Sequence, residues 1–262
     1  PLSDCLQAEG GEVMTEVVHL TINGEKVSAQ LGTRLLDVLR GLGIDIPTLC
    51  DHEGLIPWGS CRLCLVEVIE KDRSRLVASC LYPVERASKV ETESPRVRSV
   101  RRFLLTLLLA RNNDVQIVQE LAAGYGVSGE KRLPAGREQC ILCLRCVRAC
   151  NVQGRSAIGT SFRGQQKKVG PPFDDPPQDC VGCAACAAVC PTGAIEVVEE
   201  GSTRKIWGRA FEMARCERCG TSFATREQLA WVRQELGREI DDKLCPRCRQ
   251  RAEAGLMVGV KE

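Results

Sequence analysis

The sequence predicts an α+β chain made of several small domains that metal stabilises together with hydrophobic burial. Three observations carry this prediction. Aromatic residues make up only 4% of the 262 residues, 17 residues are cysteine, and short strand-like and helix-like patterns occur around those cysteines. A chain this poor in large core side chains is expected to divide into small units, and small units commonly depend on metal.

The spacing of the cysteines decides between disulfides and metal ligands. Seven Cys-x-x-Cys pairs occur, and each places two sulfurs to chelate one metal centre, whereas disulfide frameworks rarely repeat so tight a spacing. We therefore expect metal ligation and a reducing, cytoplasmic compartment.

With 36 basic and 34 acidic side chains, no strong field for nucleic acid or an anionic membrane is implied. The longest apolar run covers only 103–110, whereas a membrane span needs roughly 20 residues.

Residues 16–93 are predicted to form a small sheet packed on one helix. Apolar and polar residues alternate over 18–22 before Asn23-Gly24, the dipeptide that best suits a type I′ hairpin turn. Thr33 is expected to cap the short leucine-rich helix that follows. Further strand-like runs lie at 64–68 and 75–79.

A helical connector is predicted to follow this domain. Ser94-Pro95 has the composition of an N-cap with proline at the first helical position. The apolar positions that keep a helical period after it are 97, 100, 104, 107 and 108. Asp114 is expected to begin a second helix. Gly124 to Gly129 formally match GxGxxG, but a helix precedes them, so we interpret them as a helix stop and not as a nucleotide site.

The sequence predicts a chain of five parts. A third helix opens with a capping box at Thr225 and ends at Gly237. The predicted parts are a tail at 1–15, a first domain at 16–93, the helical connector at 94–135, a second domain at 136–200 and a third domain at 205–262. Cys5 is expected to be a free thiol in the tail.

Two four-cysteine runs with the same spacing, C-x2-C-x2-C-x3-C, predict two 4Fe-4S clusters. The runs are Cys140, Cys143, Cys146 and Cys150, and Cys180, Cys183, Cys186 and Cys190. In runs of this kind the fourth cysteine ligates the other cluster. Cluster A is therefore expected to take Cys140, Cys143, Cys146 and Cys190, and cluster B is expected to take Cys180, Cys183, Cys186 and Cys150. Zinc is the alternative, but three cysteines at consecutive spacing suit a cubane better.

Cys50, Cys61, Cys64 and Cys80 predict a 2Fe-2S site with four thiolate ligands. The plant-type spacing is C-x4-C-x2-C with a distant fourth cysteine, and here the first gap is longer. A Rieske centre needs two histidine ligands, and the chain has only His19 and His52. His19 lies on the predicted hairpin, and His52 is expected to be an ordinary loop residue.

Cys216, Cys219, Cys245 and Cys248 form two knuckles that predict structural zinc. Four thiolates in this arrangement suit a closed tetrahedral site. A further iron–sulfur cluster and free thiols are the alternatives. Acidic residues interrupt the basic residues around the knuckles, so we expect this region to dock a partner subunit and not nucleic acid.

Taken together, the motifs resemble the amino-terminal part of the large iron–sulfur subunit of complex I, which is shared with the diaphorase small subunit of NAD-linked nickel-iron hydrogenases and with NAD-dependent formate dehydrogenases. The resemblance covers 16–200 and rests on C-x10-C-x2-C, GSCRLCLVEV, LVASC, ESPRVRSVRRFLLTLLLAR, CILCLRCVRACN and CVGCAACAAVCPTGAI. It implies a 2Fe-2S ferredoxin-like (β-grasp) domain, a helical linker and a bacterial-type 2x4Fe-4S ferredoxin domain, followed here by a small zinc-ribbon-like domain. The segment after the long helix lacks the family's motif of one His and three Cys, so the corresponding 4Fe-4S cluster is expected to be absent.

The resemblance implies an electron-transfer subunit of a multisubunit NAD(H)-linked oxidoreductase, such as a hydrogenase or formate dehydrogenase. Electrons would pass between a flavoprotein NADH-oxidising subunit and a catalytic subunit. No catalytic residue is expected in this chain, because the catalytic domains of the family's larger members lie beyond the matching region. A free-standing polyferredoxin is the alternative, and a regulatory or nucleic-acid-binding metal module is the third hypothesis.

Overall fold

The computed structural model describes residues 16–71, 73–129, 136–240 and 242–258. The predicted tail at 1–15, with Cys5, lies outside the described residues. The described chain divides into two compact units. Unit 1 holds the described residues up to 49, 57–107 and 121–128, and unit 2 holds 50–56, 108–120 and the described residues from 129 onward.

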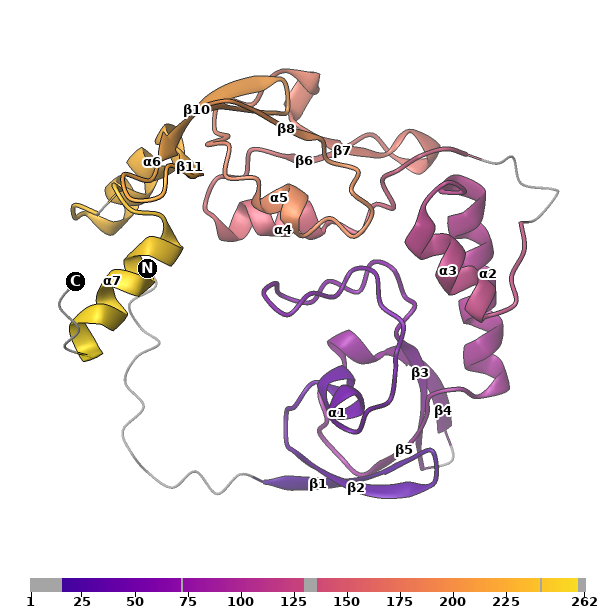
Figure 1. Ribbon diagram of the computed structural model, residues 1–262. Helices are drawn as coiled ribbons and strands as arrows, with labels where there is room; N and C mark the ends of the chain where they lie inside the picture. Colours follow the sequence, from indigo (N-terminus) through magenta and orange to yellow (C-terminus); the bar gives the residue numbers. More distant parts are fainter. Residues whose placement is uncertain (1–15, 72, 130–135, 241, 259–262) are drawn as a thin grey trace. The chain divides into compact units, whose positions relative to one another are not determined.

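Unit 1 is built on a five-stranded sheet (Figure 1) in the order β2-β1-β5-β3-β4. β1 pairs with β5 in parallel and the other neighbours pair antiparallel. Asn23 and Gly24 join β1 to β2 with φ of 49° and 93°, so the predicted type I′ turn is confirmed. The strands are β1 (Val17–Ile22), β2 (Glu25–Gln30), β3 (Leu65–Glu70), β4 (Arg73–Ala78) and β5 (Ser88–Glu91).

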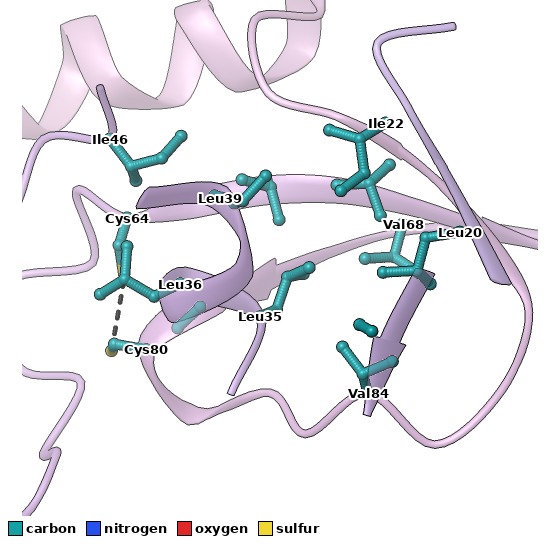
Figure 2. Close-up of a cluster of buried hydrophobic side chains, with 14 of the residues drawn as sticks. Leu20, Ile22, Leu35, Leu36, Leu39, Ile46, Cys64, Val68, Cys80 and Val84 are labelled. Atoms are coloured by element: carbon teal, nitrogen blue, oxygen red, sulfur yellow. Dashed lines mark hydrogen bonds between the residues drawn. The ribbon is translucent and has the colours of Figure 1, made fainter. Parts of the chain in front are cut away.

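Helix α1 (Leu35–Gly41) supplies three buried leucines to the core of unit 1, as Figure 2 shows. The expected cap by Thr33 is wrong, because Arg34 occupies the N-cap position and no side chain caps the helix there. The Thr33 carbonyl instead accepts a hydrogen bond from the backbone N–H of Val84. Asp37 in the first turn pairs with Arg34, which places a negative charge near the helix N-terminus.

Helix α2 (Pro95–Arg111) begins as predicted, because the Ser94 hydroxyl accepts from the Val97 N–H at 3.3 Å. The predicted apolar stripe is wrong at position 107, since Leu107 is 42% exposed. The buried positions follow a spacing of four residues and include Arg101, whose side chain is fully buried. The hydrophobic periodicity did not predict that position 101 is buried, because the residue is charged.

Arg101 binds the backbone on both sides of Cys64. Its Nε donates to the carbonyl of Leu63 at 3.0 Å, and its Nη2 donates to the carbonyl of Leu65 at 2.7 Å. Nη1 pairs with the Glu93 carboxylate and donates to the Tyr125 hydroxyl. A buried charge that is fully paired holds this segment of chain in one conformation.

Unit 2 contains two antiparallel sheets and several short helices. The sheets are β11-β10-β9-β8 and β6-β7. Their strands are β6 (Gly159–Ser161), β7 (Lys168–Gly170), β8 (Val197–Glu200), β9 (Thr203–Ile206), β10 (Arg209–Arg215) and β11 (Ser222–Thr225). The helices are α4 (Arg145–Val152), α5 (Ala185–Ala188), α6 (Arg226–Leu236) and α7 (Pro246–Val258). The four-stranded sheet runs across the predicted boundary between 200 and 205.

Two helix ends in the rest of the chain bear on the predictions. Thr225 caps α6 by accepting from the Gln228 N–H at 3.0 Å, and Gly237 ends it with φ of 58°, as predicted. Helix α3 (Gln116–Gly124) starts two residues after Asp114, because the Val115 N–H is taken by the Asn112 carbonyl in a turn. Short 3-10 turns lie at Ser79–Leu81, Gly164–Gln166 and Pro172–Asp174.

Replacing Arg101 with alanine should strongly destabilise unit 1. The change leaves the carbonyls of Leu63 and Leu65 without their donor, and each buried polar group left unsatisfied costs about 1–3 kcal/mol. Hydrogen exchange of the β3 amides measures the effect on unit 1 alone. Arg98→Ala is the matched control, because Arg98 is exposed and also pairs with Glu93. Equal protection in the two variants would contradict a structural role for Arg101.

Candidate metal centres

Three of the four cysteines predicted for the 2Fe-2S site lie together in unit 1. Cys64 and Cys80 are buried, with sulfur atoms 3.3 Å apart (Figure 2). The Cys61 sulfur accepts a hydrogen bond from the Leu49 N–H at 3.5 Å. Cys50 follows Leu49 directly in the chain and is buried, but it belongs to unit 2. The cysteines in the described part of the chain form no disulfide.

The two histidines make ordinary local hydrogen bonds. His19 Nδ1 lies 3.1 Å from the Ser28 hydroxyl on the hairpin, and His52 Nδ1 accepts from the Gly54 N–H at 3.1 Å.

Two arginines of helix α4 bind the loop that begins at Cys50, and both lie with that loop in unit 2. Arg148 donates to the carbonyls of Cys50 and Ile56, and Arg145 donates to the carbonyl of Asp51. Arg148 is buried. Sequence reasoning missed both arginines, because they lie inside a cysteine run and their partners are backbone atoms far earlier in the chain.

The two four-cysteine runs share an unusual backbone conformation. Leu142 and Leu144 in the first run, and Gly182 and Ala184 in the second, all have left-handed φ between 54° and 66°. These positions correspond in the two runs, so the duplication seen in the sequence extends to the backbone. Left-handed residues beside right-handed ones turn successive N–H groups to one side, which suits an anionic centre. The Gly182 N–H donates to the Cys180 sulfur, with the nitrogen 3.4 Å from the sulfur, as expected for a backbone that surrounds an anionic centre.

The fourth cysteine of the first run lies beside the second run. One cavity of unit 2 is lined by Cys150 together with Cys180, Cys183 and Cys186, the four residues predicted for cluster B. The Ala157 N–H donates to the Cys150 sulfur at 3.2 Å. Four thiols that converge in one cavity, with N–H donors at its edge, fit a 4Fe-4S cubane.

Electrostatic effects on the first run indicate that Cys190 lies beside it. Burial raises the pKa of the Cys140 and Cys143 thiols, and the nearby Cys190 raises both further. Burial also raises the pKa of Cys146, to about 12. For Cys190 itself burial acts upward, but hydrogen bonds from Thr192, Ala194 and Gly193 outweigh it and lower the pKa. Cys190 is therefore close enough to the first run to influence the Cys140 and Cys143 thiols.

The four-stranded sheet supports the second cysteine run from outside. Arg209 Nη1 donates to the carbonyls of Pro177, Gln178 and Cys180 at 2.7–2.8 Å. Arg204 donates to the Gly182 carbonyl at 2.8 Å. Thr225 of β11 donates to the Val181 carbonyl. Side chains of the sheet thus satisfy carbonyl groups of the run and of the residues that lead into it.

The last four cysteines converge on one place in the fold. The sulfur atoms of Cys216, Cys219, Cys245 and Cys248 all lie within 4.8 Å of one another, and all but Cys219 are buried. Backbone hydrogen bonds, chiefly from Cys245, lower the pKa of Cys216 to about 6. Burial and the neighbouring thiols raise the pKa of Cys248 to about 12. Four converging sulfurs with N–H donors fit a tetrahedral metal site.

Family comparisons match the chain in the order of the predicted iron–sulfur sites. A 2Fe-2S iron-sulfur cluster binding domain matches 15–95. A 4Fe-4S dicluster domain matches 135–197, and a second family model, also described as a 4Fe-4S dicluster domain, matches 179–225. The chain therefore combines a 2Fe-2S domain with 4Fe-4S domains in a mixed fold of helices and strands.

Individual relatives point to one class of protein. The chain is 36% identical over 212 residues to the NADP-reducing hydrogenase subunit HndD of Solidesulfovibrio fructosivorans, a match that covers 68% of this chain and 36% of the relative. It is 30% identical over 233 residues to a subunit of the NADH-quinone oxidoreductase of Rhizobium meliloti, a match that covers 78% of this chain and 27% of the relative. The mitochondrial NADH-ubiquinone oxidoreductase 78 kDa subunit of Neurospora crassa is 33% identical over 58% of this chain and 24% of its own length.

A solved structure agrees with these relatives. An NAD+-reducing [NiFe]-hydrogenase in the H2-reduced state matches with a TM-score of 0.51 and 28% identity, over 59% of this chain and 75% of that chain. The resemblance to the complex I large iron–sulfur subunit and to NAD-linked hydrogenases is thus confirmed. The chain spans between 24% and 36% of the length of the three curated relatives described above.

Gly182→Ala should damage cluster B selectively. A Cβ at Gly182 would lie 2.6 Å from the Phe211 ring, and φ is +66°, so a side chain is opposed both by contact and by backbone strain. We expect loss of roughly one 4Fe-4S cluster per chain, measured as iron content after reconstitution. Leu142→Ala, at the corresponding position of the first run, is the control and should retain its iron. Full iron content in Gly182→Ala would contradict the packing account.

Cys150→Ala should remove the cluster associated with Cys180, Cys183 and Cys186, because Cys150 lines their cavity. Cys190→Ala should instead affect the cluster of the first run. EPR of each reduced variant measures which of the two 4Fe-4S signals is lost. If Cys150→Ala and Cys146→Ala lose the same signal, the exchange of fourth cysteines is wrong.

Proposed function

We propose that this chain is the electron-transfer subunit of a multisubunit NAD(H)-linked oxidoreductase such as a hydrogenase or formate dehydrogenase. One observation supports this most directly. Cys150 of the first run lines the same cavity as three cysteines of the second, so the two 4Fe-4S sites share one small domain and can exchange electrons. The named relatives are subunits of hydrogenase and NADH oxidoreductases, which favours the same interpretation.

The proposed ligand sets follow the predictions from the sequence. The 2Fe-2S cluster takes Cys50, Cys61, Cys64 and Cys80, cluster A takes Cys140, Cys143, Cys146 and Cys190, and cluster B takes Cys180, Cys183, Cys186 and Cys150. When bound, the clusters supply one-electron transfer. The protein's part is to bury the sulfurs, to present N–H groups to them and to place positive side chains nearby. Arg111 and Arg145 act on the first run in this way, and Arg209 acts on the second.

The last four cysteines are proposed to hold structural zinc in a zinc-ribbon-like domain at 205–262. Their sulfurs are close enough for a single ion. A further iron–sulfur cluster is the alternative for this site. The same proposal divides the rest of the chain into a β-grasp domain at 16–93, a helical connector at 94–135 and a ferredoxin domain at 136–200.

The proposed partners are a flavoprotein NADH-oxidising subunit and a catalytic subunit, with no catalytic residue in this chain. Across the described residues, no helix combines the length and apolarity that crossing a bilayer demands. A free-standing polyferredoxin remains the second candidate function, because the same clusters would serve a diffusing carrier.

Metal analysis with EPR of the reduced protein tests the cofactor assignment. One 2Fe-2S and two 4Fe-4S clusters give about ten iron atoms per chain, together with about one zinc. About fourteen iron atoms without zinc would place a fourth cluster at Cys216, Cys219, Cys245 and Cys248.

Affinity purification from the native host tests the functional assignment. We expect the tagged chain to bring with it a flavin-containing subunit, and NADH should then reduce the iron–sulfur absorbance of the complex. Recovery of a lone monomer that NADH cannot reduce, even when its clusters are complete, would favour the polyferredoxin.

A further inference from the structure

We propose that the indole N–H of Trp207 donates a hydrogen bond to the Cys186 sulfur of cluster B and thereby raises the reduction potential of that cluster. The inference rests on the proposed function, since it concerns a cluster that the chain is proposed to bind. It assigns a role to a residue that lies outside both cysteine runs.

Trp207 lies in the wall of the cluster B cavity. It lines this cavity together with Cys150, Cys180, Cys183 and Cys186. Its ring packs against a buried core that includes Cys186 and Phe211. An aromatic ring at this position excludes water from the sulfurs, and its edge carries the N–H.

The Trp207 N–H is buried and needs an acceptor. Within the described residues, its Nε1 atom has no partner at ordinary hydrogen-bond geometry. An unpaired buried donor costs about 1–3 kcal/mol, so such groups in native proteins commonly have a partner that the protein atoms alone do not show. Sulfur is a large, weak acceptor in a thiol and a much better one when it is anionic and bound to iron.

Cys186 is the sulfur toward which this N–H acts. Cys186 lines the same cavity as Trp207 and belongs to the buried core against which the indole packs. The same geometry would place the donor beside an iron-bound thiolate. Reduction adds negative charge to the cluster, and an N–H donor stabilises the more negative state, so the donor raises the potential.

The backbone at Trp207 carries a cost that fits a functional role. Trp207 and Gly208 form the two-residue turn between β9 and β10, with φ of 52° and 75°. Asn or Gly is the usual first residue of such a turn, and a bulky aromatic residue in the left-handed region is uncommon. Retention of strain at a cofactor site is a recognised pattern.

The turn is held in place against the segment that leads into the second cysteine run. Arg209, which follows the turn, donates to three carbonyls between Pro177 and Cys180. A Cβ at Gly208 would lie 3.4 Å from Pro176. The turn that carries the indole is therefore tied to the segment that contains Cys180.

The test is an EPR-monitored redox titration of the full chain with Trp207→Phe. Phenylalanine retains an apolar ring in the wall but removes the donor. We expect the midpoint potential of cluster B, identified by the signal lost in Cys150→Ala, to shift to a lower value while that of cluster A stays unchanged. Iron content should equal that of the unmodified chain. Trp58→Phe is the matched control, because Trp58 is exposed and is not among the residues that line the cluster B cavity.

A second variant guards against loss of cluster B through misfolding. Replacement of Trp207 by benzothienylalanine keeps the shape of the indole and replaces only its N–H by sulfur, so it should give the same downward shift. An unchanged cluster B potential in either variant, at full iron content, overturns the role of Trp207 and leaves the proposed function intact. Absence of a second 4Fe-4S signal in the unmodified chain would instead count against the proposed function.

Discussion

The arrangement of unit 2 depends on how the carbonyl groups of the second cysteine run are satisfied. A loop that wraps an anionic cluster must turn its N–H groups inward, and its carbonyl groups are then left facing outward. In this protein Arg209 donates to three carbonyls between Pro177 and Cys180, Thr225 donates to the carbonyl of Val181, and Arg204 donates to that of Gly182. The sheet that supplies these donors is consequently part of the cluster's support, although it follows the cysteine run in sequence.

The same solution recurs elsewhere in the chain. Arg101 binds the carbonyls on either side of Cys64, and Arg148 binds the carbonyls of Cys50 and Ile56. Arginine suits this task because its planar fork can reach several carbonyls at once and remains charged when buried. Its positive charge also offsets the thiolates nearby. A fold with few aromatic residues thus gains rigidity next to its metal sites from buried arginines.

The cysteines could be found from the sequence because ligand spacing is local: the three closely spaced sulfurs of a run must lie within a few residues of one another. The hairpin turn at Asn23-Gly24 and the cap at Thr225 were predictable for the same reason. The arginines were not predictable, since each binds backbone carbonyls, which every residue has, at distant positions. The cap at Thr33 failed because a tertiary contact with Val84 took its carbonyl, and the buried position 101 on α2 was missed because its residue is charged.

The central claim is that the chain separates its cysteines beyond the tail into three iron–sulfur sites and one zinc site, with the fourth cysteines of the two runs exchanged. Anomalous diffraction from crystals of the complete protein, recorded at the iron and zinc absorption edges, tests it most directly. The account predicts iron peaks bounded by Cys150 with Cys180 to Cys186, by Cys190 with Cys140 to Cys146, and at the Cys50 to Cys80 set, with zinc only at Cys216 to Cys248. An iron cluster held by Cys140, Cys143, Cys146 and Cys150 alone would contradict it.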